Sequence, residues 1–66
     1  MIAEGTWTHT DYPSGIAVVM IETAGRTYSL LGDSRMVRDA AEALEGGPVW
    51  FATEDGVTVE AIGPLG

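Results

Sequence analysis

The sequence predicts a mainly β domain with one helix, in the element order β-β-β-α-β-β. Two observations carry this prediction. Apolar and β-branched residues form five short runs separated by turns that contain glycine or proline, which is typical of strands. Only residues 33–47 have apolar side chains at helical spacing, and they stand between the third run and the fourth. We therefore expect a single small β domain over residues 1–66.

The first strand is expected over residues 2–11. Residues 6–10 alternate strictly, so their threonines are predicted on one face of the strand and Trp7 with His9 on the other. Gly5 is expected to mark a bulge or a close approach of another backbone.

The second strand is expected over residues 16–23, and residues 16–21 are all apolar. Such a run offers no polar face to water, so we expect it to need cover on both sides, at least in part. Ala24 and Gly25 then predict a tight hairpin, with Gly25 at positive φ. The third strand is expected over residues 26–31.

The helix is expected to begin at an N-cap formed by Asp33 or Ser34 and to stop at two glycines, 46 and 47. Pairs four residues apart, Arg35–Asp39 and Arg38–Glu42, are predicted on its polar face. Its apolar stripe is thin and mostly alanine, so the helix is expected to cap a barrel rather than form a core of its own. The stripe comprises Met36, Val37, Ala40, Ala41, Ala43 and Leu44.

After the helix, a hairpin is expected. Residues 48–53 predict the fourth strand, residues 54–56 a hairpin loop with glycine in the left-handed conformation, and residues 57–62 the fifth strand. Residues 63–66 are expected to form a short tail.

Composition restricts how so small a domain is stabilised. With no cysteine and one histidine, disulfides, cysteine-ligated zinc and a histidine-rich metal site are excluded. A domain of this size buries a modest share of its surface and is marginally stable alone. Association with copies of itself or docking on a partner protein therefore remains as the source of extra stability.

The charge balance bears on the class of partner. Ten acidic residues face three arginines, Arg26, Arg35 and Arg38, and the net charge is −7. Without a basic footprint, nucleic-acid binding is disfavoured, and so is binding to an anionic membrane surface. The longest apolar run, 16–21, is too short to span a membrane, and the N-terminus has no basic region of a signal peptide. We expect a cytoplasmic protein.

No catalytic, cofactor-binding or metal-binding residues are predicted, so we expect no enzyme. Lysine and cysteine nucleophiles are absent, and the serines, Ser14, Ser29 and Ser34, each stand where a turn, a strand or a helix cap accounts for them. His9 and Asp11 share a strand face, but they provide too few ligands for zinc.

Three segments carry a resemblance to a known fold. They are Gly5-Thr6-Trp7 in the first strand, residues 25–32 around the third, and Gly47-Pro48-Val49-Trp50 at the start of the fourth. With the element order, they resemble the OB-fold, a five-stranded Greek-key barrel, at the size of bacterial translation initiation factor one. The basic groove of nucleic-acid-binding OB domains is missing here. An SH3-like barrel and an α+β antiparallel sheet with one helix are the alternative folds.

Two groups of side chains are candidates for protein interaction. The first is an aromatic patch of Trp7, Tyr12 and Tyr28, because tyrosine and tryptophan are favoured in interface hot spots. The second is an acidic helix face of Asp39, Glu42 and Glu45. We expect an acidic protein-binding module that self-associates or serves as an accessory or structural subunit, with a phage-type protein as one candidate. A DNA-mimicking anti-defence inhibitor and an OB-type binder of single-stranded nucleic acid are the alternatives.

Overall fold

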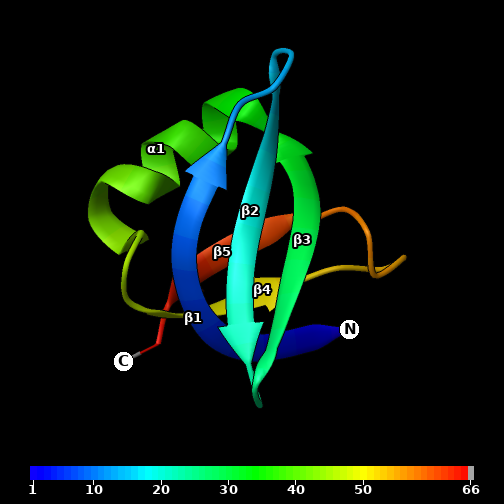
Figure 1. The fold of residues 1–66 in the computed structure, drawn as a ribbon, viewed down its shortest axis with the longest axis vertical. Coiled ribbons are helices and arrows are strands. Elements are labelled where there is room, and N and C mark those ends of the chain that lie inside the picture. Colours follow the sequence, from blue (N-terminus) through cyan, green and yellow to red (C-terminus); the bar gives the residue numbers. More distant parts are fainter. Residues whose placement is uncertain (66) are drawn as a thin grey trace.

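The computed structural model describes residues 1–65, and Gly66 of the predicted tail lies outside the described residues. Five antiparallel strands form one curved sheet, with a single helix packed beside it (Figure 1). The predicted fold class and element order are confirmed. In chain order the elements are β1 (Ile2–Asp11), β2 (Ile16–Thr23), β3 (Arg26–Asp33), α1 (Ser34–Leu44), β4 (Pro48–Ala52) and β5 (Ala61–Pro64).

The strands follow a Greek-key path. The first three strands are joined by short turns, and the connection through α1 returns β4 to the free side of β1, so the sheet order is β3-β2-β1-β4-β5. The sheet curls until β3 approaches the segment before β5, where Leu31 and Thr58 form an isolated parallel bridge. The sheet is not closed, and the result is a partly open, barrel-like fold.

The core lies inside this curved sheet. From α1 only Val37 is fully buried, while Met36, Ala40, Ala41 and Leu44 pack against the core partly exposed. Ala43, which was predicted on the apolar stripe, is exposed instead. The buried core side chains are Trp7, Ala17, Val19, Ile21, Leu30, Val37, Val49, Phe51 and Val59.

The helix is shorter than predicted, and the third strand is longer. Asp33 ends β3 and is the N-cap, because its Oδ1 accepts the backbone N–H groups of Arg35 and Met36 at 3.0 Å. Gly46 has a φ of 93° and turns the chain away from the helix axis. The predicted arginine–carboxylate pairs are absent, since the described residues contain no such pair within 4.0 Å.

The predicted fifth strand, 57–62, was wrong at both ends. The Asp55 carboxylate accepts the N–H groups of Val57 and Thr58 at 2.8 Å, which holds these residues in a loop. Residues 57–59 bond to Leu31 of β3 rather than to β4. Pairing with β4 begins at Ala61, so β5 includes two residues of the predicted tail, and β4 itself ends at Ala52.

The predicted alternation of β1 was also wrong. The pairing register with β2 shifts between Trp7 and His9, so Thr8 is the extra residue of a β-bulge. The bulge reverses which face the following residues use. Trp7 is therefore buried, whereas His9 is exposed.

Candidate interaction surfaces

Trp7 belongs to the core and is not part of a surface patch. Its side chain is 0% exposed, and its indole Nε1 donates to Oγ1 of Thr10 at 2.8 Å. Its backbone is also held, because its N–H donates to the carbonyl of Gly47 and its carbonyl accepts from Gly46. The indole is therefore unavailable to a partner.

The two tyrosines lie at opposite ends of the β2–β3 hairpin. Tyr12 precedes β2, and the guanidinium carbon of Arg38 lies 5.1 Å from the centre of its ring, which ties this turn to α1. Tyr28 pairs with Ile21 near the other end of β2. The three predicted aromatic residues thus form no common patch.

The acidic helix face is present as a surface. Asp39, Glu42 and Glu45 are all exposed. Asp39 and Glu42, three residues apart, lie on one side of α1, and Glu45 is the C-cap residue just past its end. Asp39 also borders a shallow hollow of about 240 Å³ that it shares with Ser34, Arg35 and Arg38, so this end of the helix is mixed in charge.

An apolar surface runs over the outer face of β2 and β3. On β2, Ala17, Val19 and Ile21 are fully buried, so the alternate residues face outwards. Val18 pairs with Leu31 of β3, which is 41% exposed. We call this surface the outer patch, and it comprises Ile16, Val18, Met20 and Leu31.

Polar groups border the outer patch on both sides. Asp11 pairs with Val18 and His9 pairs with Met20 on β1, and the two polar side chains approach each other to 3.7 Å. On the other side, Ser29 Oγ lies 3.3 Å from Sδ of Met20. An apolar centre with a polar rim is the composition of a protein interface. From the sequence, residues 16–21 were expected to need cover on both sides, and Leu31 was expected only as a strand residue.

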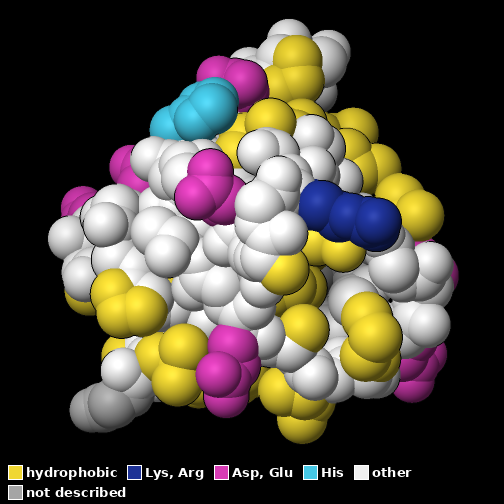
Figure 2. Space-filling model, turned by 60° about the horizontal axis from the view of Figure 1, so that its bottom comes forward, with side chains coloured by type: hydrophobic (Ala, Val, Ile, Leu, Met, Phe, Trp, Pro, Cys, Tyr) yellow, Lys and Arg dark blue, Asp and Glu magenta, His cyan; other side chains and the backbone are white. Residues whose placement is uncertain are grey.

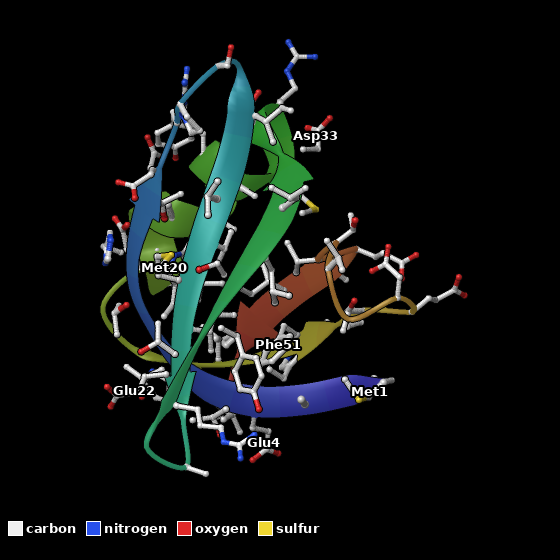
Figure 3. All side chains as sticks on the ribbon, turned by 45° about the vertical axis from the view of Figure 1, so that its right-hand side comes forward. Met1, Glu4, Met20, Glu22, Asp33 and Phe51 are labelled. Atoms are coloured by element: carbon white, nitrogen blue, oxygen red, sulfur yellow. The ribbon has the colours of Figure 1, made fainter. Side chains whose placement is uncertain are left out.

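A second apolar surface is a hollow of about 270 Å³ at the other end of the sheet, which we call the seam hollow. Phe51 lies between β3 and the beginning of β1, and Met1 and Glu4 lie along that part of the chain (Figure 3). Tyr28 and Leu30 line it from β3. The sequence gives no signal for this hollow, because it arises where the curled sheet fails to close.

The charge distribution matches neither a basic groove nor a uniform acidic surface. In the view of Figure 2 a basic side chain lies among hydrophobic ones, while acidic side chains are spread over other parts of the face. Arg26 follows the β2–β3 turn, whereas Arg35 and Arg38 are on α1. The arginines thus do not line one groove.

The loop before β5 is organised by the carboxylate of Asp55. Hydrogen bonds from the N–H groups of Thr58 and Val57 hold the pKa of Asp55 below its ordinary value of 3.8. Because these bonds organise the segment that reaches β3, the perturbation has a structural cause.

Within residues 1–65, no cluster of three or more histidine, cysteine or carboxylate side chains is arranged to hold a metal ion. The described part of the chain also contains no helix with the length and apolar character needed to cross a membrane. No protein-family model, curated protein or solved structure matches this chain.

Proposed function

We propose that this chain is a non-enzymatic, acidic protein-binding module that binds through the outer patch. The observation that carries the proposal is the uncovered outer side of β2. Ile16 is 50% exposed and Leu31 is 41% exposed, and no element of the described chain packs over them. Contiguous apolar surface with a polar rim favours protein partners, including a second copy of the chain.

The barrel type forms part of this proposal. The Greek-key order, the helix between β3 and β4, and the parallel bridge from Leu31 to Thr58 support an OB-like, partly open barrel. Within such a barrel the outer patch would serve as a binding face for protein rather than for nucleic acid. The separation of Arg26 from the two helix arginines supports that choice.

The test removes the outer patch while keeping the strands. Ile16→Thr combined with Leu31→Thr retains β-branched residues on the surface but removes apolar area. We expect the double variant to fold, and to lose both concentration-dependent association in sedimentation and capture of partner proteins identified by mass spectrometry. Val57→Thr is the matched control, because Val57 is 52% exposed but lies in the loop before β5.

The proposal fails if the wild-type chain stays monomeric at high concentration and captures no protein. It also fails if the double variant captures the same partners as the control. Circular dichroism of both variants separates loss of binding from loss of folding.

A second candidate function uses the acidic helix face. The exposed carboxylates of Asp39 and Glu42 on α1 and of Glu45 at its C-cap support a DNA-mimicking inhibitor of a nucleic-acid-binding protein, such as a phage anti-defence protein. Neutralising all three as Asp39→Asn, Glu42→Gln and Glu45→Gln should then abolish partner capture. The control is the equal charge change at three exposed carboxylates elsewhere, namely Glu22→Gln, Glu54→Gln and Glu60→Gln. Equal losses in both variants would point to net charge alone.

A further inference from the structure

The outer edge of β3, which faces away from β2, is hydrogen-bonded at one end and open at the other. At Leu31 this edge forms two backbone hydrogen bonds. The N–H of Leu31 donates to the carbonyl of Val57, and its carbonyl accepts from the N–H of Val59, each at 2.7 Å. Closer to the β2–β3 turn, the described residues provide no further backbone bond on that side of β3. Half of this edge strand is therefore left without a neighbour.

The open part presents backbone groups in strand geometry. In an antiparallel pair, successive residues point their N–H and C=O groups alternately toward and away from the partner strand. Since Leu31 points its groups away from β2, Ser29 and Thr27 do so as well. Each of these residues offers a donor and an acceptor along the open edge.

The seam hollow lies beside this open edge. Tyr28 and Leu30, which alternate with Thr27 and Ser29, turn their side chains toward it and line its wall. Phe51 forms the opposite side, and the hollow is mostly apolar. Tyr28 is 41% exposed even though it faces the core side of β3, because the hollow opens there.

The open edge carries little of the usual protection, because Arg26 beside the β2–β3 turn is the only charged residue of segment 26–32. Natural edge strands avoid unwanted pairing through lysine, proline, bulges or inward charges. Residues 26–32 contain no acidic residue, lysine or proline, and β3 pairs with β2 in continuous register. Threonine and tyrosine in this segment also favour strand pairing.

We propose that the open edge of β3 accepts an extended segment of a partner protein as an added strand, with an apolar side chain of that segment in the seam hollow. The added strand would bond to the backbone of Thr27 and Ser29. This proposal rests on the proposed protein-binding function, and it adds a surface distinct from the outer patch together with a chemical description of the partner.

Charge defines the partner segment further. Among residues 1–65, Glu4 is the only one with a carboxylate that lines the hollow, and the chain as a whole carries a charge of −7. A lysine or arginine beside the apolar side chain would therefore be favoured in the segment. At this edge a basic segment is therefore a better fit than a strand of a second copy, which contains no lysine to face Glu4.

The experiment uses an acetylated and amidated peptide, Lys-Val-Thr-Phe-Thr-Val-Lys, titrated into the ¹⁵N-labelled chain. We expect the amide resonances of Thr27 and Ser29 to shift and their hydrogen exchange to slow. The decisive comparison is the same peptide with N-methyl groups on alternate amides. The methylated peptide keeps every side chain but loses half of its backbone N–H donors. When these donors are the ones that face β3, we expect about tenfold weaker binding than for the unmethylated peptide.

Three variants of the chain make the same test from the other side. Ser29→Pro removes the outward N–H without removing a bond to β2, which an edge strand tolerates. Ser29→Ala keeps that N–H. We expect the proline variant to lose peptide binding and the alanine variant to retain it. Glu4→Gln, which removes the carboxylate that lines the hollow, should weaken binding of this lysine-containing peptide.

Several results would overturn this proposal. Equal binding of methylated and unmethylated peptides would rule out strand addition. Peptide-induced shifts confined to Val18 and Leu31 would place the peptide on the outer patch. That result would refute strand addition at β3 but would support the proposed function. Shifts at Thr27 and Ser29 that depend on protein concentration without peptide would make a second copy the occupant.

Discussion

Trp7 and Thr10 are joined by a side-chain hydrogen bond of 2.8 Å that crosses the bulge at Thr8. In a regular strand these two side chains would point to opposite faces, because they are three residues apart. The extra residue brings both to the core side, so the buried indole N–H finds an acceptor within its own strand. The bulge thus allows the largest core side chain to be buried without an unsatisfied donor.

We expect Thr10→Val to lower the free energy of unfolding by about 1–3 kcal/mol, because the shape is kept while the buried indole N–H loses its acceptor. Urea unfolding followed by tryptophan fluorescence measures the change. Thr6→Val on the same strand is the control, since Thr6 is exposed, and its effect should stay within about 0.5 kcal/mol. Equal effects of the two substitutions would show that the hydrogen bond contributes little.

The bulge also explains where sequence reasoning succeeded and failed on β1. Periodicity located the strand correctly at residues 2–11. The same periodicity assigned His9 to the face of Trp7, because a single inserted residue leaves no mark in the pattern of side-chain types. The close approach of another backbone expected at Gly5 is present, since a Cβ there would lie 2.8 Å from the carbonyl oxygen of Glu22.

Gly32 lies where β3, the helix and the loop before β5 converge. A Cβ at this position would lie 2.7 Å from Cγ2 of Val37 and 2.9 Å from Cγ1 of Val59. We therefore expect Gly32→Ala to destabilise the fold by about 1–3 kcal/mol through overpacking. Thermal unfolding measures this, and adding Val37→Ala to the same chain should restore part of the loss.

Gly47→Ala is the matched control for Gly32→Ala. The nearest atom to a Cβ at Gly47 is the carbonyl oxygen of Leu44 at 3.6 Å, which is an ordinary contact. We expect its effect to lie within about 0.5 kcal/mol of zero. If Gly32→Ala is equally harmless, the contact between β3 and α1 must be loose enough to yield.

The fifth strand shows a limit of local patterns. Residues 57–62 alternate as a strand should. However, residues 57–59 lie against Leu31 of β3, and pairing with β4 begins only at Ala61. Alternation gives the conformation of a segment but not its neighbour, which depends on how far the sheet curls. The seam hollow was missed for the same reason. The expected cover of β2 is present on its inner face, whereas Ile16 is 50% exposed on the outer face, and cover by a partner stays a prediction.

Ala24 adopts a left-handed conformation in the β2–β3 turn, with a φ of 51°, next to Gly25 at 77°. This conformation costs a residue with a Cβ about 1–2 kcal/mol, and asparagine tolerates it better. We expect Ala24→Asn to raise the free energy of unfolding by about 0.5–1 kcal/mol. Ala43→Asn, on the exposed side of α1, should have the opposite sign because asparagine is a weaker helix former. A destabilising effect at both positions would contradict the turn geometry.

The Asp55 loop predicts a pH dependence of stability. The N–H groups of Thr58 and Val57 lower the pKa of Asp55 from 3.8, so the ionised carboxylate stabilises the folded state at pH values above 3.8. This contribution is lost as the pH falls through the folded-state pKa. We therefore expect Asp55→Asn to unfold at lower temperature than the wild type at neutral pH, and the difference to shrink as the pH falls below 3.8.

Glu54→Gln is the control for this titration, because Glu54 is the adjacent exposed carboxylate. Its effect on unfolding should not follow the titration of Asp55, which carbon-detected NMR of the carboxyl group measures directly. A difference between Asp55→Asn and the wild type that stays constant over the whole pH range would show that ionisation of Asp55 does not contribute to stability. The loop would then depend on the geometry of its hydrogen bonds and not on the charge of their acceptor.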